Sequence, residues 1–142
     1  MQIISIDVIG VPASQGSLVG NGRYGMRYQN DKELKSWRHS VICELINARP
    51  EKWNEDAAMS VSCEFRFMRP KSHFGKSGLR KSAPVYKTTK TDVDKNLRAI
   101  FDSIEQSGLA RNDSQIIHAV CSKRYCETGE APGASITLSS QP

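Results

Sequence analysis

Long hydrophobic runs are missing from this chain of 142 residues. No stretch approaches the roughly 18 consecutive apolar residues that a membrane-spanning helix needs. Met1, Gln2 and Ile3 lead straight into alternating apolar and polar residues, without the basic and apolar regions of a secretion signal. These absences argue against membrane insertion and export, and we expect a soluble, cytoplasmic protein.

Closely spaced cysteine pairs are missing as well. The four cysteines are Cys43, Cys63, Cys121 and Cys126. None of them forms the Cys-x-x-Cys pair of zinc ribbons and redox motifs, so the signal for a zinc site or a disulfide is weak. Small core side chains are a common use of such residues. The pattern favours buried free thiols.

Acidic residues are absent from residues 69 to 90, the most unusual stretch of the chain by composition. Its cations are Arg69, Lys71, Lys76, Arg80, Lys81, Lys87 and Lys90. The prolines and glycines among them predict a flexible loop without regular structure. Phe74 and Tyr86 add flat surfaces that suit unstacked bases.

This basic loop and the net charge of +5 indicate a polyanionic partner, with nucleic acid the first to consider. The plain alternative is a solvated loop whose charge only aids solubility. On the loop alone the two interpretations balance. An acidic cluster follows the loop directly, and this neighbour favours DNA.

Hydrophobic residues make up 38% of the chain, which is enough for one hydrophobic core. A chain of 142 residues is too short for two comfortable domains. We therefore expect one α/β (α+β) domain over residues 1 to 142, in which a mixed sheet of about four strands carries two main helices. The pattern predicts, in order, a strand at 2 to 10, a loop with a small hairpin around Gly22, a helix at about 32 to 49 capped by Asp31, a strand at 59 to 68, a helix ending at Gly108, and strands at about 115 to 126 and 133 to 139.

Three aspartates near the second predicted helix could share one ligand. Thr91 or Asp92 can serve as the N-cap, and an Asp92 just outside the helix could face the same ligand as Asp94. Arg98 lies one turn beyond Asp94 on the same face. Asp113 begins the next strand, and a short return of the chain would let it approach the helix N-terminus. Carboxylates grouped beside a cationic loop suit metal-assisted hydrolysis of a phosphodiester.

Each of these acids also has an ordinary explanation. Acidic residues are favoured in the first turn of any helix, which accounts for Asp92 and Asp94. Asp113 lies in the segment 111 to 114, which has good turn chemistry. Only the combination of the three, beside the basic loop, favours a catalytic site.

Two parts of the chain resemble a known family. The first comprises Thr91-Asp92-Val93-Asp94-Lys95-Asn96-Leu97-Arg98-Ala99-Ile100-Phe101-Asp102 and Asn112-Asp113-Ser114-Gln115-Ile116-Ile117. It is similar to D-x-D-N-L-x-K-A-x-x-D-A-L followed by D-D-[SA]-Q-V, the pattern of the RusA family of Holliday-junction resolvases. The second comprises Gly10-Val11-Pro12-Ala13-Ser14-Gln15-Gly16-Ser17 and Trp37-Arg38. It resembles G-x-P-x-P-Q-G-S and W-R of phage-type members.

The resemblance implies a Mg²⁺-dependent endodeoxyribonuclease, with Mn²⁺ as a substitute, that resolves four-way DNA junctions by paired nicks in recombination and repair. It also implies a homodimer in a bacterial or phage-infected cell, since a symmetric dimer matches a two-fold junction. Asp92, Asp94 and Asp113 would be catalytic metal ligands. Arg98 stands where the family has a catalytic lysine, and it suits charge stabilisation because it cannot carry a proton. Asn112 replaces an aspartate and leaves one carboxylate fewer near the metal.

The expected DNA contacts come from both loops and from the helix: Lys71, Lys76, Arg80, Lys81, Lys87, Lys90, Lys95, Gln15 and Ser17. Three hypotheses remain open on the residues. The chain is a junction resolvase, or a module that binds branched or single-stranded DNA and has lost cutting, or an adaptor whose acids only cap a helix. Cleavage of a four-way junction with and without Mg²⁺ separates the three.

Overall fold

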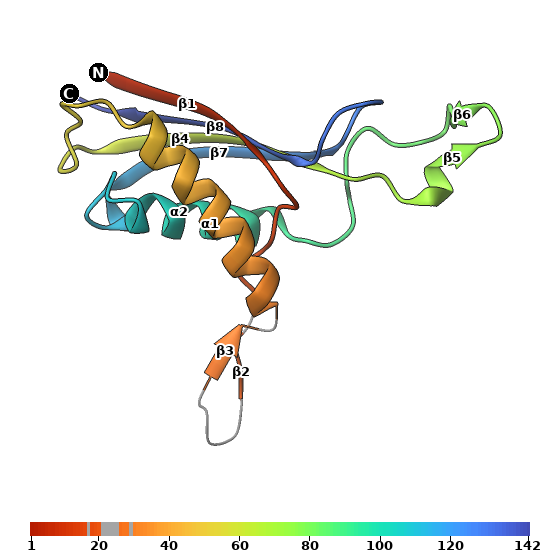
Figure 1. Ribbon diagram of the computed structural model, residues 1–142, viewed down its shortest axis with the longest axis horizontal. Coiled ribbons are helices and arrows are strands. Elements are labelled where there is room, and N and C mark those ends of the chain that lie inside the picture. The colour runs from red at the N-terminus through yellow and green to blue at the C-terminus, as the bar shows by residue number, and fades with distance from the viewer. Residues whose placement is uncertain (17, 21–25, 29) are drawn as a thin grey trace.

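Four strands build one mixed sheet in the computed structural model, and both helices lie on one side of it (Figure 1). The structure describes residues 1–16, 18–20, 26–28 and 30–142. In chain order its elements are β1 (Gln2–Ile9), β2 (Leu18–Gly20), β3 (Met26–Tyr28), α1 (Asp31–Ala48), β4 (Met59–Phe67), β5 (Phe74–Gly75), β6 (Gly78–Leu79), α2 (Val93–Gln106), β7 (Ile116–Tyr125) and β8 (Gly133–Ser140). The predicted architecture is confirmed.

The main sheet has the strand order β1-β8-β4-β7. β8 pairs antiparallel with β1 and β4, whereas β4 and β7 run parallel. A parallel pair needs a crossover connection, and the segment containing α2 supplies it. β1 and β7 are therefore the edges of this sheet, and within the described chain β7 pairs with a strand on one side only.

The core lies between the sheet and the two helices. The predicted stripe of α1 is confirmed, because Leu34, Trp37, Val41 and Leu45 are all buried. α2 contributes Ile100 and Ile104, which are fully buried. Full burial of a large apolar side chain stabilises the fold by about 1.5–3 kcal/mol. This packing holds α2 against the core and thereby sets the positions of both ends of that helix.

Two small hairpins project from the body of the protein (Figure 1). β2 and β3 pair antiparallel, as the expected hairpin requires, although residues 21–25 between them lie outside the described part of the chain. β5 and β6 form a second hairpin inside the basic loop, after a 3₁₀ turn at Lys71–His73. The prediction of no regular structure in this loop was wrong, because Gly75 and Gly78 pair across a two-residue turn and close a hairpin. Gly78 has φ +100°, a conformation that glycine adopts readily.

Two further expectations are corrected by the structure. α1 begins at Asp31, so Asn30 is the N-cap residue, and its amide Nδ2 donates to Ser14 O at 2.8 Å instead of capping the helix. All four cysteines are free, and Cys63 and Cys126 are buried as expected. Cys43 is exposed because it lies off the buried stripe of α1.

Candidate active site

The N-terminus of α2 carries the first part of the candidate site. Asp92 is the N-cap residue, with an extended backbone at ψ 139°, and its carboxylate makes no capping bond. The side chain is 65% exposed, and Lys95 Nζ lies 3.4 Å from its Oδ2. Asp92 therefore stands just outside the helix, which is the condition under which it can face the same ligand as Asp94.

Asp94 and Arg98 are exposed on the first two turns of α2 and lie four residues apart on one face. The positive end of the helix dipole favours a carboxylate at this place. Asp94 also acts on Cys121 of β7: burial, and after it this carboxylate, raises the pKa of the thiol. The acid pair thus lies beside the second half of β7.

Two lysines hold the segment that leads into Asp92. Lys123 of β7 donates from Nζ to Thr89 O at 2.7 Å and to Thr91 O at 2.5 Å. Lys87 donates from Nζ to Thr89 Oγ1 at 2.7 Å. The bonds of Lys123 tie the chain directly before the N-cap to the sheet, and the bond of Lys87 links residues within that segment. The position of Asp92 is therefore set by β7 and α2 together.

Asp113 lies at the other end of α2. Its backbone N–H donates to Oε2 of Glu105, in the last turn of the helix, at 3.2 Å. With a rise of about 1.5 Å per residue, Glu105 is roughly 16 Å along the helix from Asp94. β7 does return beside α2, but it starts next to Asp113 and reaches the helix N-terminus only at Lys123. The expectation that one chain brings Asp113 to Asp92 was therefore wrong.

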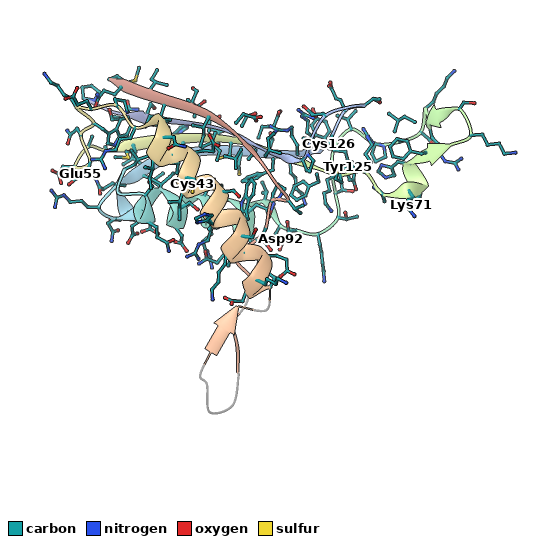
Figure 2. The ribbon with its side chains drawn as sticks, in the orientation of Figure 1. Cys43, Glu55, Lys71, Asp92, Tyr125 and Cys126 are labelled. Atoms are coloured by element: carbon teal, nitrogen blue, oxygen red, sulfur yellow. The ribbon has the colours of Figure 1, made fainter. Side chains whose placement is uncertain are left out.

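The residues around Asp113 form a capped turn. Asn112 Oδ1 accepts from Ser114 N at 2.9 Å, and Gln115 Oε1 accepts from Asn112 N at 2.9 Å. Gln115 Nε2 also donates to the carbonyls of Glu55 and Ala57, at 2.9 and 3.0 Å. Asparagine and aspartate cap equally well. The Asn112 departure therefore preserves this turn, which lies well away from Asp92, as the separation of Glu55 and Asp92 in Figure 2 shows.

The carboxylates of Asp92 and Asp94 are the side chains at this helix end that could bind a metal ion. In the ranges that the structure describes, no three histidine, cysteine or carboxylate side chains gather to hold one ion. Asp92 and Asp94 supply two exposed carboxylates at one helix end. Mg²⁺ is commonly held by one or two carboxylates, with water and substrate phosphate completing its shell. The pair fits such an ion, with a ligand set that one chain leaves open.

The basic loop is rooted on Tyr125 at the end of β7 (Figure 2). Arg69 Cζ lies 5.3 Å from the ring centroid, and the guanidinium donates to two backbone carbonyls at 3.0 and 2.7 Å. His73 meets the same ring edge-on at 4.8 Å. Lys87 Nζ is 5.9 Å from that ring's centroid, and desolvation lowers its pKa. Lys87 thus belongs to the loop's root and not to its exposed part.

The other predicted DNA contacts divide into two groups. Exposed on the projecting part of the loop are Lys71, Lys76, Arg80 and Lys81. Lys90 and Lys95 lie next to the acid pair, where both line a hollow with Asp92. Gln15 is only 7% exposed, and its N–H donates to Lys95 O at 3.1 Å, so it packs on α2. Ser17 lies outside the described residues.

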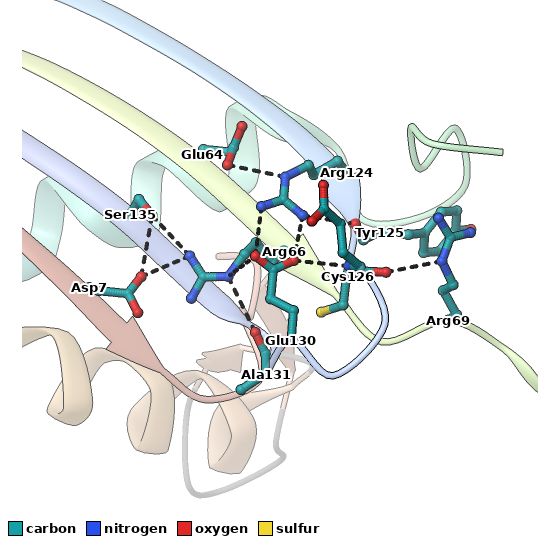
Figure 3. A network of polar contacts seen from close by, with 11 residues as sticks. Asp7, Glu64, Arg66, Arg69, Arg124, Tyr125, Cys126, Glu130, Ala131 and Ser135 are labelled. Atoms are coloured by element: carbon teal, nitrogen blue, oxygen red, sulfur yellow. Dashed lines mark hydrogen bonds and ion pairs between the residues drawn. The ribbon is translucent and has the colours of Figure 1, made fainter. Parts of the chain in front are cut away.

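A polar network covers the open face of the sheet near the root of the loop (Figure 3). The buried Arg66 lies 2.8 Å from Asp7 and donates to Ser135 Oγ at 2.9 Å. Arg124 forms a two-pronged pair with Glu130 at 2.6 and 2.9 Å, which holds the pKa of Glu130 well below its usual range, at about 2. The network links β1, β4, β7 and β8. Its charges are satisfied by one another, so it stabilises the sheet instead of forming a ligand site.

Sequence reasoning missed Lys123 and Asn96. The contact of Lys123 with residues 89 and 91 depends on how β7 returns along α2, which no local pattern reveals. Asn96 is fully buried, and its Oδ1 accepts from Thr91 Oγ1 at 2.5 Å. A signal for Asn96 did exist, because it lies four residues before the buried Ile100, on the apolar face of α2.

Carboxylates at a helix end beside exposed cations are suited to metal-assisted cleavage of DNA. The comparison with known families also indicates a DNA-cleaving enzyme. The family model described as Endodeoxyribonuclease RusA matches residues 10–139. This match covers nearly the whole chain. The protein belongs to the RusA endodeoxyribonuclease family, and the resemblance noted in the sequence is confirmed. No curated protein matches the chain.

None of the helices in the described ranges combines the length and the apolar character that crossing a bilayer requires.

Proposed function

We propose that this protein is a homodimeric, Mg²⁺-dependent endonuclease that resolves four-way DNA junctions by paired nicks, in DNA recombination and repair. Mn²⁺ would replace Mg²⁺. The observation that carries the proposal is the exposed pair Asp92 and Asp94 at the N-terminus of α2, flanked by Lys90 and Lys95. Family membership supports DNA cleavage, and this pair is where the chain would perform it.

Asp92 and Asp94 would hold the metal ion. When bound, such an ion polarises the scissile phosphate and lowers the pKa of an attacking water. Lys95 now neutralises Asp92 at 3.4 Å and would turn to a phosphate oxygen of the substrate. Arg98 carries a guanidinium cation and would stabilise charge that develops on the phosphoryl oxygens. Lys123 would keep the segment before Asp92 in place throughout.

A partner chain would supply the third carboxylate. Asp113 and Asp94 lie at opposite ends of α2, so one site can contain both only if they come from two chains. β7 connects the two ends as an edge strand, and it exposes Ile117 by 66% and Val120 by 53%. The outer edge of β7 is covered at its end by Val85 and Tyr86, through the bridge from Tyr86 to Arg124 and the bond from Tyr125 N to Val85 O. Before Arg124 this edge pairs with no described strand, and exposed apolar side chains on such an edge favour association. Two β7 edges paired antiparallel about a two-fold axis would place Asp113 of one chain near Lys123 of the other.

The DNA backbone would be held at two places. The loop cations Lys71, Lys76, Arg80 and Lys81 project away from the sheet and would contact phosphates of the junction arms. Lys90 and Lys95 would hold the phosphate next to the cut. Lys87 would order the root of the loop. Gln15 would hold Lys95 in place through its backbone N–H, which donates to Lys95 O. Ser17 remains an expected contact to DNA.

Cleavage of a synthetic four-way junction tests the proposal. With Mg²⁺ we expect symmetric nicks in two opposed strands, and without a divalent metal we expect binding alone. Asp94→Asn should reduce cutting by more than about 100-fold, because it removes a ligand of the reacting centre, while binding persists. Glu44→Gln, which removes an exposed carboxylate of α1 outside the acid pair, is the control and should cut normally.

Two results would contradict this function. Binding without nicks under all metal conditions would identify a protein that binds branched or single-stranded DNA and does not cut it. Equal cutting by Asp94→Asn and the unmodified protein would place the chemistry elsewhere in the chain.

A further inference from the structure

Two hollows meet at the N-terminus of α2. The smaller has a volume of about 300 Å³ and is lined by Asp92 and Lys95, among others. The larger, of about 540 Å³, lies between α1 and the backbone of residues 10–14. The residues common to both are Ser14, Asn30 and Thr91. A continuous groove therefore leads from Asp92 into the larger hollow, which the proposed cleavage chemistry does not use.

The larger hollow has an apolar interior and a polar rim. Pro12, Ala13 and Trp37 provide apolar surface, and Trp37 is itself only 2% exposed, so this wall is rigidly packed. Ser36 and Ser40 place hydroxyl groups along the α1 side. Pockets for small organic groups have volumes of about 300–1,000 Å³ and combine apolar walls with a few polar groups. A flat base with hydrogen-bonding edges has the matching character.

Charge around the groove fits a nucleotide chain that runs through it. Lys90 and Lys95 flank the smaller hollow, and Lys32 stands beside the larger one. Asp92 and Glu33 face the same groove. The acid pair at one end suits a phosphate held through a metal ion, and cations along the groove suit the neighbouring phosphates. Only a sugar separates a phosphate from its base, so a strand with its phosphate in the smaller hollow carries a base toward the larger one.

We propose that the larger hollow receives one unstacked nucleobase of the strand that is cut, next to the scissile phosphate. This inference rests on the proposed function and adds base selection to it. Contacts to phosphates position a protein on DNA, whereas contacts to bases distinguish sequences. The wall formed by α1 and residues 10–14 would therefore decide where along a junction the enzyme cuts. Bases at a branch point are the easiest to extrude, because they are already poorly stacked.

Filling the hollow tests the inference. Ser36 lines it from the exposed face of α1, and leucine is a strong helix former, so Ser36→Leu obstructs part of the hollow while preserving the helix. Cys43→Leu is the matched control, since residue 43 is exposed about two turns further along the same face, outside the hollow. Thermal unfolding verifies the fold of each variant. Ser40 lines the same wall of the hollow, so Ser40→Leu is the variant to use if Ser36→Leu does not fold.

The probe is a four-way junction with 2-aminopurine at each position flanking the branch point in turn, bound in EDTA. This base analogue brightens when it leaves the stack. The unmodified protein and Cys43→Leu should raise the fluorescence several-fold at one position, and Ser36→Leu should not. With Mg²⁺, preference among the four bases at that position should fall from about tenfold to within about twofold in Ser36→Leu, while phosphate contacts keep its junction affinity.

Each outcome decides between the two proposals. If Ser36→Leu brightens the probe and keeps the base preference of the unmodified protein, the hollow takes no base, and the nuclease assignment still stands. If the unmodified protein cuts no junction with Mg²⁺, the proposed function fails. The fluorescence in EDTA still reports on the hollow in that case, because it requires no cleavage.

Discussion

Mixed dimers offer the sharpest test of a site completed by a partner chain. Asp94→Asn and Asp113→Asn each damage both sites of a homodimer, so each variant alone should be inactive. In a dimer that contains one chain of each kind, one site combines both damaged residues. The other site combines the intact Asp94 of one chain with the intact Asp113 of the other. Activity should therefore return when the two inactive variants are allowed to exchange chains.

The expected magnitude follows from the separation of the two aspartates. Random exchange at equal amounts makes about half of the dimers mixed, and each mixed dimer holds one intact site of two. About a quarter of the unmodified number of sites should thus be recovered, against a background lower by more than about 100-fold. Because the second site stays broken, the recovered product should be a single nick instead of a resolved junction.

The assay is cleavage of a labelled four-way junction after the two variants have been co-refolded. Asp92→Asn mixed with Asp94→Asn is the matched control: both changes lie in the same half of the site, so the mixed dimer has no intact site. If Asp94→Asn with Asp113→Asn recovers no more activity than this control, the third ligand does not come from a partner. Full activity of Asp113→Asn alone would remove that residue from the site.

Three further predictions concern stability and binding. Gly133→Ala should destabilise the fold by about 1–3 kcal/mol in urea unfolding, because its Cβ would lie 1.9 Å from Val8 O, whereas Gly20→Ala meets nothing within 4 Å and should be neutral. The pKa of Glu130 is lowered from 4.5 to about 2 in the fold, so its pair with Arg124 stabilises the protein above that window and is lost as the pH falls through it; Glu130→Gln should flatten the pH dependence of unfolding there, and an unchanged profile would contradict the pairing. Replacing the four exposed loop cations by glutamine should make the slope of log affinity against log salt less negative by up to about 4, while an unchanged slope would show that the loop does not touch phosphate; the replaced residues are Lys71, Lys76, Arg80 and Lys81.

Most of the fold was predictable because local patterns determine it. The apolar stripe of α1 follows directly from the spacing of Leu34, Trp37, Val41 and Leu45, and all four are buried. The alternation of β4 likewise predicts its buried face. The prediction for the basic loop failed because prolines and glycines generally interrupt regular structure, whereas Gly78, at φ +100°, here follows directly after the two-residue turn of a hairpin.

The site was predictable only in part, because half of its geometry is non-local. Asp92 at the N-cap and Asp94 in the first turn follow from helix rules within a few residues. The distance from Asp113 to this pair depends on the length of α2 and on the direction in which β7 returns. Residue types and spacing near Asp113 predicted its turn, and they could not show that Lys123 is the strand residue that reaches the helix N-terminus.

The length of α2 also bears on why the proposed enzyme would cut two strands together. If one chain could gather all its carboxylates, a single subunit would cut one strand, and nothing would ensure that the opposed strand is cut as well. Asp94 lies in the first turn of α2 and Asp113 is hydrogen-bonded to its last turn, so in the proposed site neither chain alone would hold a complete set of carboxylates. The proposed two-fold dimer would complete both sites in the same event, because any symmetric pairing that brings Asp113 of one chain to its partner does the reverse as well. Paired nicks in opposed strands would then follow from symmetry, and a lone chain would have no complete site with which to leave a damaging single nick.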